Sequence, residues 1–188
     1  MSTSNQTGDL ADNFLQLIAT DDLPGLGPEV RSSVDQASEL NAKIRDWAKE
    51  HHLDSELIDL LRSAALLWHD HLDASHSVSQ SIPSATGSFL HGIMHRREPD
   101  YGNAKYWFHR VGNHGAYEAI YSNVKEKVDN GGLSPEFAYL VRSGSWDPFG
   151  FVDAVSRGTA DQTNSDLVAE LKHIQEIEFQ SLIRSFFS

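Results

Sequence analysis

The sequence predicts an all-α protein: a single-domain helical bundle with several short capping helices. Apolar residues recur every three or four positions along several stretches, as they do on the buried face of an amphipathic helix. A capping residue followed by proline, at Ser134-Pro135 and again at Asp147-Pro148, is typical of a helix start. No stretch alternates apolar and polar residues in the way that the strands of a β-hairpin do.

The length and composition predict one globular domain. A chain of 188 residues is long enough to bury a core without disulfides, and this one contains no cysteine. With 39% hydrophobic and 22% charged residues, its composition is that of a globular protein. We expect the polar residues 1–9 to form a disordered N-terminal tail and residues 10–188 to form a single helical domain.

Three helices are predicted in the first half of the chain, over residues 10–18, 28–52 and 55–80. Pro28 suits the first turn of the second helix, and Asp54 or Ser55 can cap the third. The third helix also carries polar side chains beside its apolar seam, at steps of four, three and four residues. These aligned side chains are those of His69, Asp73, His76 and Gln80.

Shorter helices are predicted in the second half of the chain. They span residues 89–97, 104–111 and 116–128, and two more begin at Pro135 and Pro148. Ser88 and Asn103 are the expected N-caps of the first two, and Gly112 ends the second. A long last helix over residues 165–187 is expected to close the bundle.

The segment from Gly87 to His114 concentrates polar side chains in a chain that is acidic elsewhere. It contains four histidines, three arginines, one lysine and the aromatic run Tyr106-Trp107-Phe108. Arginine, lysine and histidine are costly to bury unless each finds a partner, so packing alone rarely asks for such a density. The sequence therefore predicts a functional site in this segment, together with the polar side of the preceding helix.

A metal site is the first hypothesis for this segment. His91 and His95 are four residues apart, which places both imidazoles on one side of a helix, as in metalloenzymes that take two ligands from one helix. Helical bundles hold divalent Zn, Fe or Mn with inward histidines and carboxylates from several helices. The predicted ligands are His69, Asp73, His76, His91 and His95. The alternative is a buried polar network, without metal, in which Asp73 orients a histidine.

The basic and aromatic residues of the same segment predict a site for a small anion. Guanidinium groups bind carboxylate or phosphate in a bidentate manner and stack on aromatic rings. The predicted substrate-binding residues are Arg96, Arg97, Asn103, Lys105, Trp107 and Arg110. Tyr106 or His109 would act as proton donor. The alternative is that the basic residues form salt bridges with Glu98, Asp100 and Glu118.

The charge and the N-terminal sequence limit the partners and the location. A formal net charge of -12 repels nucleic acid and anionic lipid, so neither a nucleic acid nor a membrane is an expected partner. The N-terminal segment has neither a basic nor an apolar region of a secretory signal, which favours the cytoplasm. A homodimer is compatible with an acidic helical bundle, although no heptad run is long enough to predict one.

Three segments resemble a family of uncharacterised proteins. They are HDHLDASH from His69, HGIMHRREPDYGNAKYWFHRVGNH from His91, and WDPFGFVD from Trp146. The family shares a His-Asp doublet, the central histidine and arginine motif, and the Trp-Asp-Pro-Phe motif. The resemblance implies that the three segments belong together, and it brings no established activity.

The leading functional hypothesis is a metal-dependent enzyme with histidine and carboxylate ligands that acts on a small anionic substrate. A second hypothesis is a metal-free module that binds a small anion through the same basic and aromatic residues. A third is a helical interaction or scaffold protein whose polar network serves packing alone. Whether the protein is an enzyme stays open at this level.

Overall fold

The computed structural model describes residues 3–160 and 164–188, with the backbone alone for residues 3–9, and it confirms an all-α single domain. In these residues ten helices follow one another. They are α1 (Thr3–Leu17), α2 (Ala37–Glu50), α3 (Ser55–Trp68), α4 (Leu72–Ser79), α5 (Ala85–Arg97), α6 (Tyr101–Val111), α7 (Ala116–Asp129), the 3₁₀ helix η1 (Pro135–Val141), α8 (Pro148–Ala160) and α9 (Ser165–Ser185).

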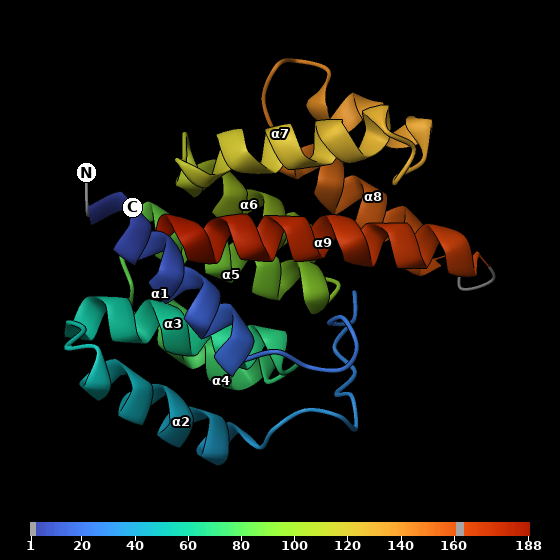
Figure 1. The fold of residues 1–188 in the computed structure, drawn as a ribbon. Helices are drawn as coiled ribbons and strands as arrows, with labels where there is room; N and C mark the ends of the chain where they lie inside the picture. Colours follow the sequence, from blue (N-terminus) through green and yellow to red (C-terminus); the bar gives the residue numbers. More distant parts are fainter. Residues whose placement is uncertain (1–2, 161–163) are drawn as a thin grey trace.

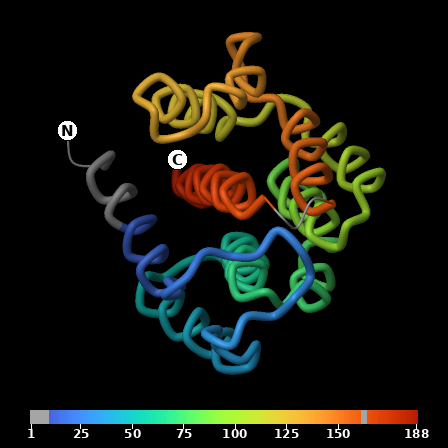
Figure 2. Tube along the Cα trace, turned by 90° about the vertical axis from the view of Figure 1, so that its right-hand side faces the viewer, coloured from blue at the N-terminus to red at the C-terminus, as the bar shows by residue number. Residues whose placement is uncertain are grey.

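The last helix, α9, lies in the middle of the molecule. Figure 1 shows α9 crossing the centre, with α7 and α8 on one side of it and α1 to α4 on the other. Seen along its axis in Figure 2, α9 is surrounded by the rest of the chain. Leu171, Ile174, Phe179 and Leu182 of this helix are buried, and so are Gln175 and Glu178. A helix that is buried on most sides needs partners for its polar side chains, and these prove to include an arginine of α5.

Several helix starts follow the capping rules that the sequence predicts. The Asp54 carboxylate accepts a hydrogen bond from the Leu57 N–H at the start of α3. Asp147 accepts one from the Gly150 N–H at the start of α8. Gly112, with a φ of +63°, ends α6 as expected, because glycine reaches this left-handed conformation without steric cost. Local chemistry therefore sets these ends.

Two other predicted caps are wrong. Helix α5 begins earlier than expected, at Ala85, because its N-cap is Ser84 rather than Ser88, and the Ser84 hydroxyl accepts a hydrogen bond from the Gly87 N–H. Helix α6 begins at Tyr101, since the Asp100 carboxylate accepts the Asn103 N–H. Helix α1 begins at Thr3 and so includes residues 3–9 of the expected tail, whereas residues 1–2 lie outside the described part.

The second predicted helix is too long at its start, and Pro28 does not begin it. Helix α2 begins at Ala37, and the residues before it form an irregular segment. The backbone N–H of Arg31 donates to Asp70, and that of Asp35 donates to Nδ1 of His69. These bonds to distant residues replace the bonds that a helix would make here, so tertiary contacts override the amphipathic pattern.

The third predicted helix is in fact two helices. Helix α3 ends at Trp68, α4 begins at Leu72, and Asp70 between them has a φ of +63°. Its buried carboxylate accepts hydrogen bonds from Arg31 and Arg97, at 2.7 and 2.6 Å. The two charged contacts hold Asp70 in a conformation that asparagine and aspartate tolerate better than most residues. The break turns α4 away from the axis of α3.

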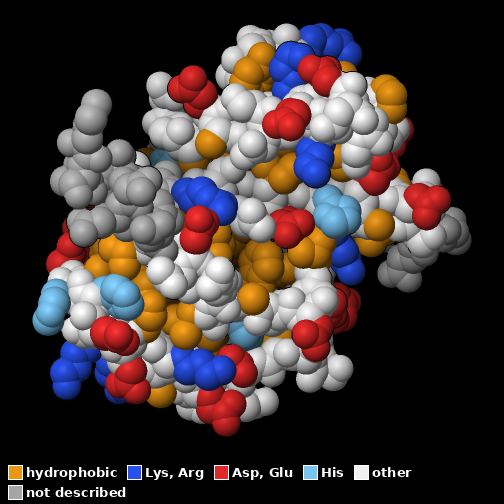
Figure 3. Space-filling model, viewed as in Figure 1, with side chains coloured by type: hydrophobic (Ala, Val, Ile, Leu, Met, Phe, Trp, Pro, Cys, Tyr) orange, Lys and Arg blue, Asp and Glu red, His pale blue; other side chains and the backbone are white. Residues whose placement is uncertain are grey.

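The surface carries charges of both signs. In the view of Figure 3, acidic side chains (red) are spread over the face, and the basic side chains (blue) lie among them rather than in one patch. Among the helices of the described residues, none combines the length and the apolar character needed to cross a membrane.

Candidate metal centre

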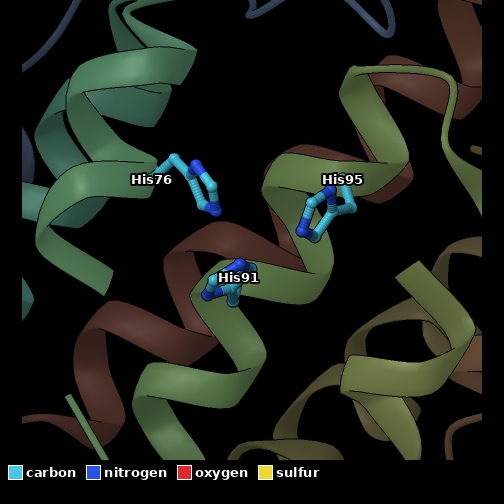
Figure 4. Close-up of side chains that lie close together, drawn as sticks. All are labelled: His76, His91 and His95. Atoms are coloured by element: carbon cyan, nitrogen blue, oxygen red, sulfur yellow. The ribbon is translucent and has the colours of Figure 1, made fainter. Parts of the chain in front are cut away.

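Three imidazoles meet where α4 packs against α5. His76 comes from α4, and His91 and His95 lie one turn apart on α5, as Figure 4 shows. Their ligand atoms all lie within 4.8 Å of one another, so the group could hold a metal ion. His91 and His95 are buried, with 2% and 7% of their surface exposed, and His76 is half-buried. The break between α3 and α4 makes this meeting possible, because it sets the direction of α4.

A small movement would complete the coordination. Nitrogen ligands on a tetrahedral zinc ion lie about 3.3 Å apart, given Zn–N bonds of about 2.0 Å. The rings would therefore approach one another by up to about 1.5 Å, which side-chain rotation supplies. The donor set also suits the ion, since imidazole is a common ligand of Zn, Fe, Ni and Cu and a poor one for Mg and Ca.

The hydrogen bonds leave the rings of His91 and His76 available. Nδ1 of His91 is buried and has no hydrogen-bond partner. Among the described residues, no side chain or backbone group forms a hydrogen bond with the ring nitrogens of His76 either. A buried polar atom without a partner costs about 1–3 kcal/mol, so such atoms are rare unless a ligand or water reaches them. The orphaned nitrogen of His91 is the observation that best fits a metal.

His95 has neighbours on both sides of its ring. Nδ1 lies 3.2 Å from Oε2 of Glu98, which is one turn further along the chain. The Asn103 amide nitrogen lies 3.1 Å from Nε2 and 3.4 Å from Nδ1. Because the carboxylate can only accept, Nδ1 carries the hydrogen and Nε2 accepts from the amide. A carboxylate behind a histidine is the usual support of a metal ligand.

Aromatic stacking extends from the group to the surface. The Trp107 ring lies parallel to His91, with 3.9 Å between the ring centroids and an angle of 16°. The Arg110 guanidinium lies 5.0 Å from the Trp107 centroid, at cation–π distance. The three histidine rings also contact one another, with centroid distances of 4.7 to 5.4 Å.

The surroundings favour the neutral form of His91 and His95. Burial is the largest cause that lowers the pKa of His91, to about 4, and the nearby His95, His76 and Arg110 lower it further. Burial also lowers the pKa of His95, although the charge of Glu98 acts against it. Neutral imidazole is the form that binds a metal, so burial favours the ligating form of these two residues.

Two of the expected ligands lie elsewhere, which corrects the predicted five-residue centre. His69 is buried at the end of α3, where Nδ1 accepts the Asp35 N–H and Nε2 donates to the Ile18 carbonyl oxygen. Both of its nitrogens are therefore used. Asp73 is exposed on α4 and is not in the histidine group. The prediction assumed an unbroken third helix, and the break at Asp70 separates these residues from His76.

Arg96 and Arg97 are part of the core, which corrects the expectation that they bind substrate. Both side chains have an exposed fraction of 0%. Arg96 forms a bidentate pair with Glu178 of α9, at 3.1 and 2.6 Å, and Arg97 pairs with Asp70. A guanidinium that is buried and paired cannot meet a dissolved anion. The alternative prediction, that these arginines form salt bridges, is confirmed for Arg96 and Arg97. Their partners are Glu178 and Asp70, not the acidic residues that the sequence suggested.

The other predicted substrate and catalytic residues are closer to the surface. Lys105 pairs with Asp153 at 2.6 Å, and His109 is exposed. Tyr106 is 53% exposed, and its hydroxyl accepts a hydrogen bond from Arg110 at 3.3 Å. Of the basic residues that were expected to bind substrate, only Arg110 contacts the histidine group through Trp107.

Sequence reasoning missed Glu98 as a partner of the site. It entered only as a salt-bridge partner of the arginines, yet its spacing of three residues from His95 on a helix was a signal that could have shown the contact. Asp70 was also missed, because its role depends on two arginines that lie 39 and 27 residues away in the sequence.

Comparisons with known proteins add no family. The chain matches no family model, no curated protein and no solved structure. That the three motifs belong to a family of uncharacterised proteins stays a prediction. The function of the chain is therefore inferred from the geometry of the histidine group.

Proposed function

We propose that this chain binds a divalent transition metal through His76, His91 and His95 and is a metal-dependent enzyme that acts on a small anionic molecule. The observation that carries the proposal is the meeting of three imidazoles from two helices, with a buried nitrogen of His91 that has no other partner. Zn²⁺ is the first candidate ion, because it takes three histidines in catalytic sites and keeps a fourth position open.

A metal held by three imidazoles supplies a polarising charge and a bound water of lowered pKa. The residues around the ligands orient them and control access to the metal. Glu98 would orient His95, whose Nε2 would bind the metal in place of the Asn103 amide that it contacts in the structure. His76 is half-buried, so solvent reaches part of the group.

Arg110 is the residue that we propose to bind the anion. Its guanidinium is exposed, lies over Trp107 and acts electrostatically on His91. Guanidinium groups recognise carboxylate and phosphate in a bidentate manner, and a ring face holds the group flat. The surface next to the histidine group thus offers one cation for a small phosphate or carboxylate.

Metal analysis of the purified protein tests the first part of the proposal. Protein stripped by a chelator is titrated with Zn²⁺, and one ion per chain is expected to bind. Replacing any of the three histidines by Ala is expected to weaken binding by at least about tenfold, since each removes one ligand. His109→Ala is the matched control, because His109 is exposed and belongs to the same segment. Stoichiometric binding that survives all three replacements would place the metal elsewhere.

Activity is tested separately. Hydrolysis of p-nitrophenyl phosphate by the zinc-loaded protein is compared with that by the chelated protein. Arg110→Ala is expected to raise KM by about tenfold or more with little change in bound zinc, because it removes the anion partner and leaves the ligands in place. Equal rates with and without metal would contradict the enzyme proposal without affecting the metal site.

A scaffold role is the second candidate, and one observation favours it. Arg96 and Arg97 of the central motif are buried in the core and paired with carboxylates, and the histidine rings contact one another and Trp107 as packed aromatic groups. In that case His91→Phe would keep the stacking and the stability, and the protein would bind no metal. The zinc titration therefore decides between the two.

A further inference from the structure

An open cavity lies away from the histidine group. It has a volume of about 760 Å³ and is lined by the end of α6, the first half of α7, residues 143–147 and the start of α8. This volume is within the usual range for small-molecule sites, about 300–1,000 Å³. None of the three histidines of the candidate metal centre lines it. Its walls come from α7 and from two segments, Gly112 to His114 and Trp146 to Phe149, that the proposed metal function does not use.

The walls are aromatic. The lining includes five aromatic residues, Phe108, Tyr117, Tyr121, Trp146 and Phe149. Phe108 and Trp146 are only 1% and 3% exposed, so the rings that a ligand can reach are those of Tyr117, Tyr121 and Phe149. Phe149 is 38% exposed, whereas most phenylalanines of the described chain are buried in the core. Tyr117 and Tyr121 are half-buried and lie one turn apart on α7. Ring faces of this kind attract cations, because their π-electrons form a negative surface.

The charges of the cavity are of one sign. Glu118 and Asp147 line it, and the described lining residues include no lysine or arginine. Glu118 is exposed and forms no ion pair with any other described residue. Asp147 uses one carboxylate oxygen to cap α8 and has a second one left. His114 adds no free donor, since its nitrogens contact the Ala116 N–H and the Thr86 hydroxyl. A cation is therefore favoured over an anion.

The aromatic walls and the two carboxylates together suit a small cation.

We propose that this cavity binds a small organic ammonium cation, held by the aromatic rings and the two carboxylates. The proposal is independent of the metal function, because it uses different residues. Recognition of quaternary ammonium groups by rings and carboxylates is a general use of cation–π attraction.

Two probes of the same shape test the proposal. Choline and 3,3-dimethylbutan-1-ol differ in that a carbon atom replaces the charged nitrogen. Calorimetric titration of the whole chain, with chelator present, is expected to give a Kd of about 1 mM or tighter for choline. The neutral alcohol is expected to bind about tenfold more weakly or worse, since it keeps the shape and loses the charge. Equal binding of the two probes, or no binding of choline, would overturn the proposal.

Variants locate the binding. Tyr121→Leu and Glu118→Gln are each expected to weaken choline binding by about threefold or more, because they remove one ring or one charge. Glu126→Gln is the matched control, as it lies two turns further along α7, is exposed and does not line the cavity. Glu118 is exposed as well, so its replacement leaves the fold intact. Choline binding that is unchanged in both wall variants would show that the cation binds elsewhere and would contradict the assignment.

Discussion

His95 shows how neighbouring side chains select one ring nitrogen for a metal. Glu98 lies 3.2 Å from Nδ1, and the Asn103 amide lies 3.1 Å from Nε2. A hydrogen held on Nδ1 by the carboxylate leaves the lone pair on Nε2 and makes the imidazole a stronger ligand. The site thus depends on a residue that does not itself bind the metal.

The first prediction follows from this contact. Glu98→Ala is expected to weaken Zn²⁺ binding by about 10- to 100-fold, because His95 loses the group that fixes its tautomer. The zinc affinity of Glu98→Gln is expected to lie between that of Glu98→Ala and that of the unchanged protein, since the amide oxygen still accepts the Nδ1 hydrogen. Competition with a coloured chelator measures the affinity. Glu50→Ala, an exposed acidic residue on α2, controls for loss of charge. Unchanged affinity in Glu98→Ala would show that His95 needs no such support.

The second prediction concerns pH. The pKa of His91 is lowered from 6.5 to about 4 in the folded protein, chiefly by burial. As the pH falls below 6.5, His91 binds a proton in the unfolded chain but stays neutral in the folded protein. The free energy of unfolding therefore decreases until about pH 4. The contribution of His91 to this loss is about 3 kcal/mol. Urea unfolding of the chelated protein across this range measures it.

A variant isolates His91 from the other buried histidines, since burial lowers the pKa of His69 and His114 in the same direction. His91→Phe keeps an aromatic ring on Trp107 and does not titrate. The free energy of unfolding of this variant is expected to fall less steeply between pH 6.5 and pH 4. A constant difference between the two proteins across the range would mean that His91 is not held neutral.

At the residue scale, the sequence predicted which residue types gather but not which are buried. The spacing of His91 and His95 predicted that both face one way, and the structure brings them to His76. The burial of Arg96 and Arg97 was not predictable in the same manner. Their partners Glu178 and Asp70 lie 82 and 27 residues away, and local spacing carries no information about such contacts.

At the element scale, the break between α3 and α4 positions the site. A straight helix would place His69, Asp73 and His76 in one row, and the bend at Asp70 separates them. Burial opposes ionisation of Asp70, but the hydrogen bonds from Arg31 and the charge of Arg97 outweigh it and lower its pKa. The ionised carboxylate therefore joins the segment before α2, the bend and the end of α5.

The third prediction tests this junction. Asp70→Asn keeps the shape and the tolerance for positive φ but removes the charge that pairs two arginines. Loss of one partner of a buried ion pair costs about 3–5 kcal/mol, and a loss of this size in unfolding free energy is expected. Asp73→Asn, an exposed change three residues later, is expected to alter stability by less than about 0.5 kcal/mol. Similar stabilities for the two variants would refute the role given to Asp70.

The helix ends that could be predicted were those with a capping residue in the nearby sequence. The starts of α3, α8 and α9 carry their own caps, and α9 ends within two residues of the predicted position. The start of α2 was wrong because Arg31 and Asp35 bond to the bend at residues 69–70. An apolar stripe predicts which face of a helix is buried. It does not predict that backbone N–H groups in the stripe form hydrogen bonds with distant side chains instead of with the helix.

At the scale of the whole molecule, α9 makes the chain one unit. Arg96 of α5 reaches Glu178 and Gln175 on α9, and its guanidinium lies 4.4 Å from the centre of the Phe151 ring of α8. The buried apolar residues of the described helices form one continuous core. The sequence predicted that the last helix closes the bundle, whereas the structure places it at the centre, because the buried face of α9 is wider than a single stripe.

The last prediction concerns the effect of zinc on the stability of the whole domain. The candidate metal centre joins α4 to α5, and α5 is tied to α9 by a buried ion pair, so a metal that binds the folded chain stabilises the whole domain rather than two helices. Zn²⁺ at about 100 times its Kd is expected to add about 2.7 kcal/mol to the free energy of unfolding. For a domain of this size, that corresponds to an increase in Tm of about 5–10 °C.

Thermal unfolding is followed by helical and by tryptophan signals, and both are expected to shift together with zinc and to return with chelator. His91→Ala is expected to remove the shift and His109→Ala to keep it, because only His91 belongs to the group. A shift confined to one signal would show that α4 and α5 unfold apart from α9. The metal centre would then be a local clip, and the central position of α9 would not make the domain cooperative.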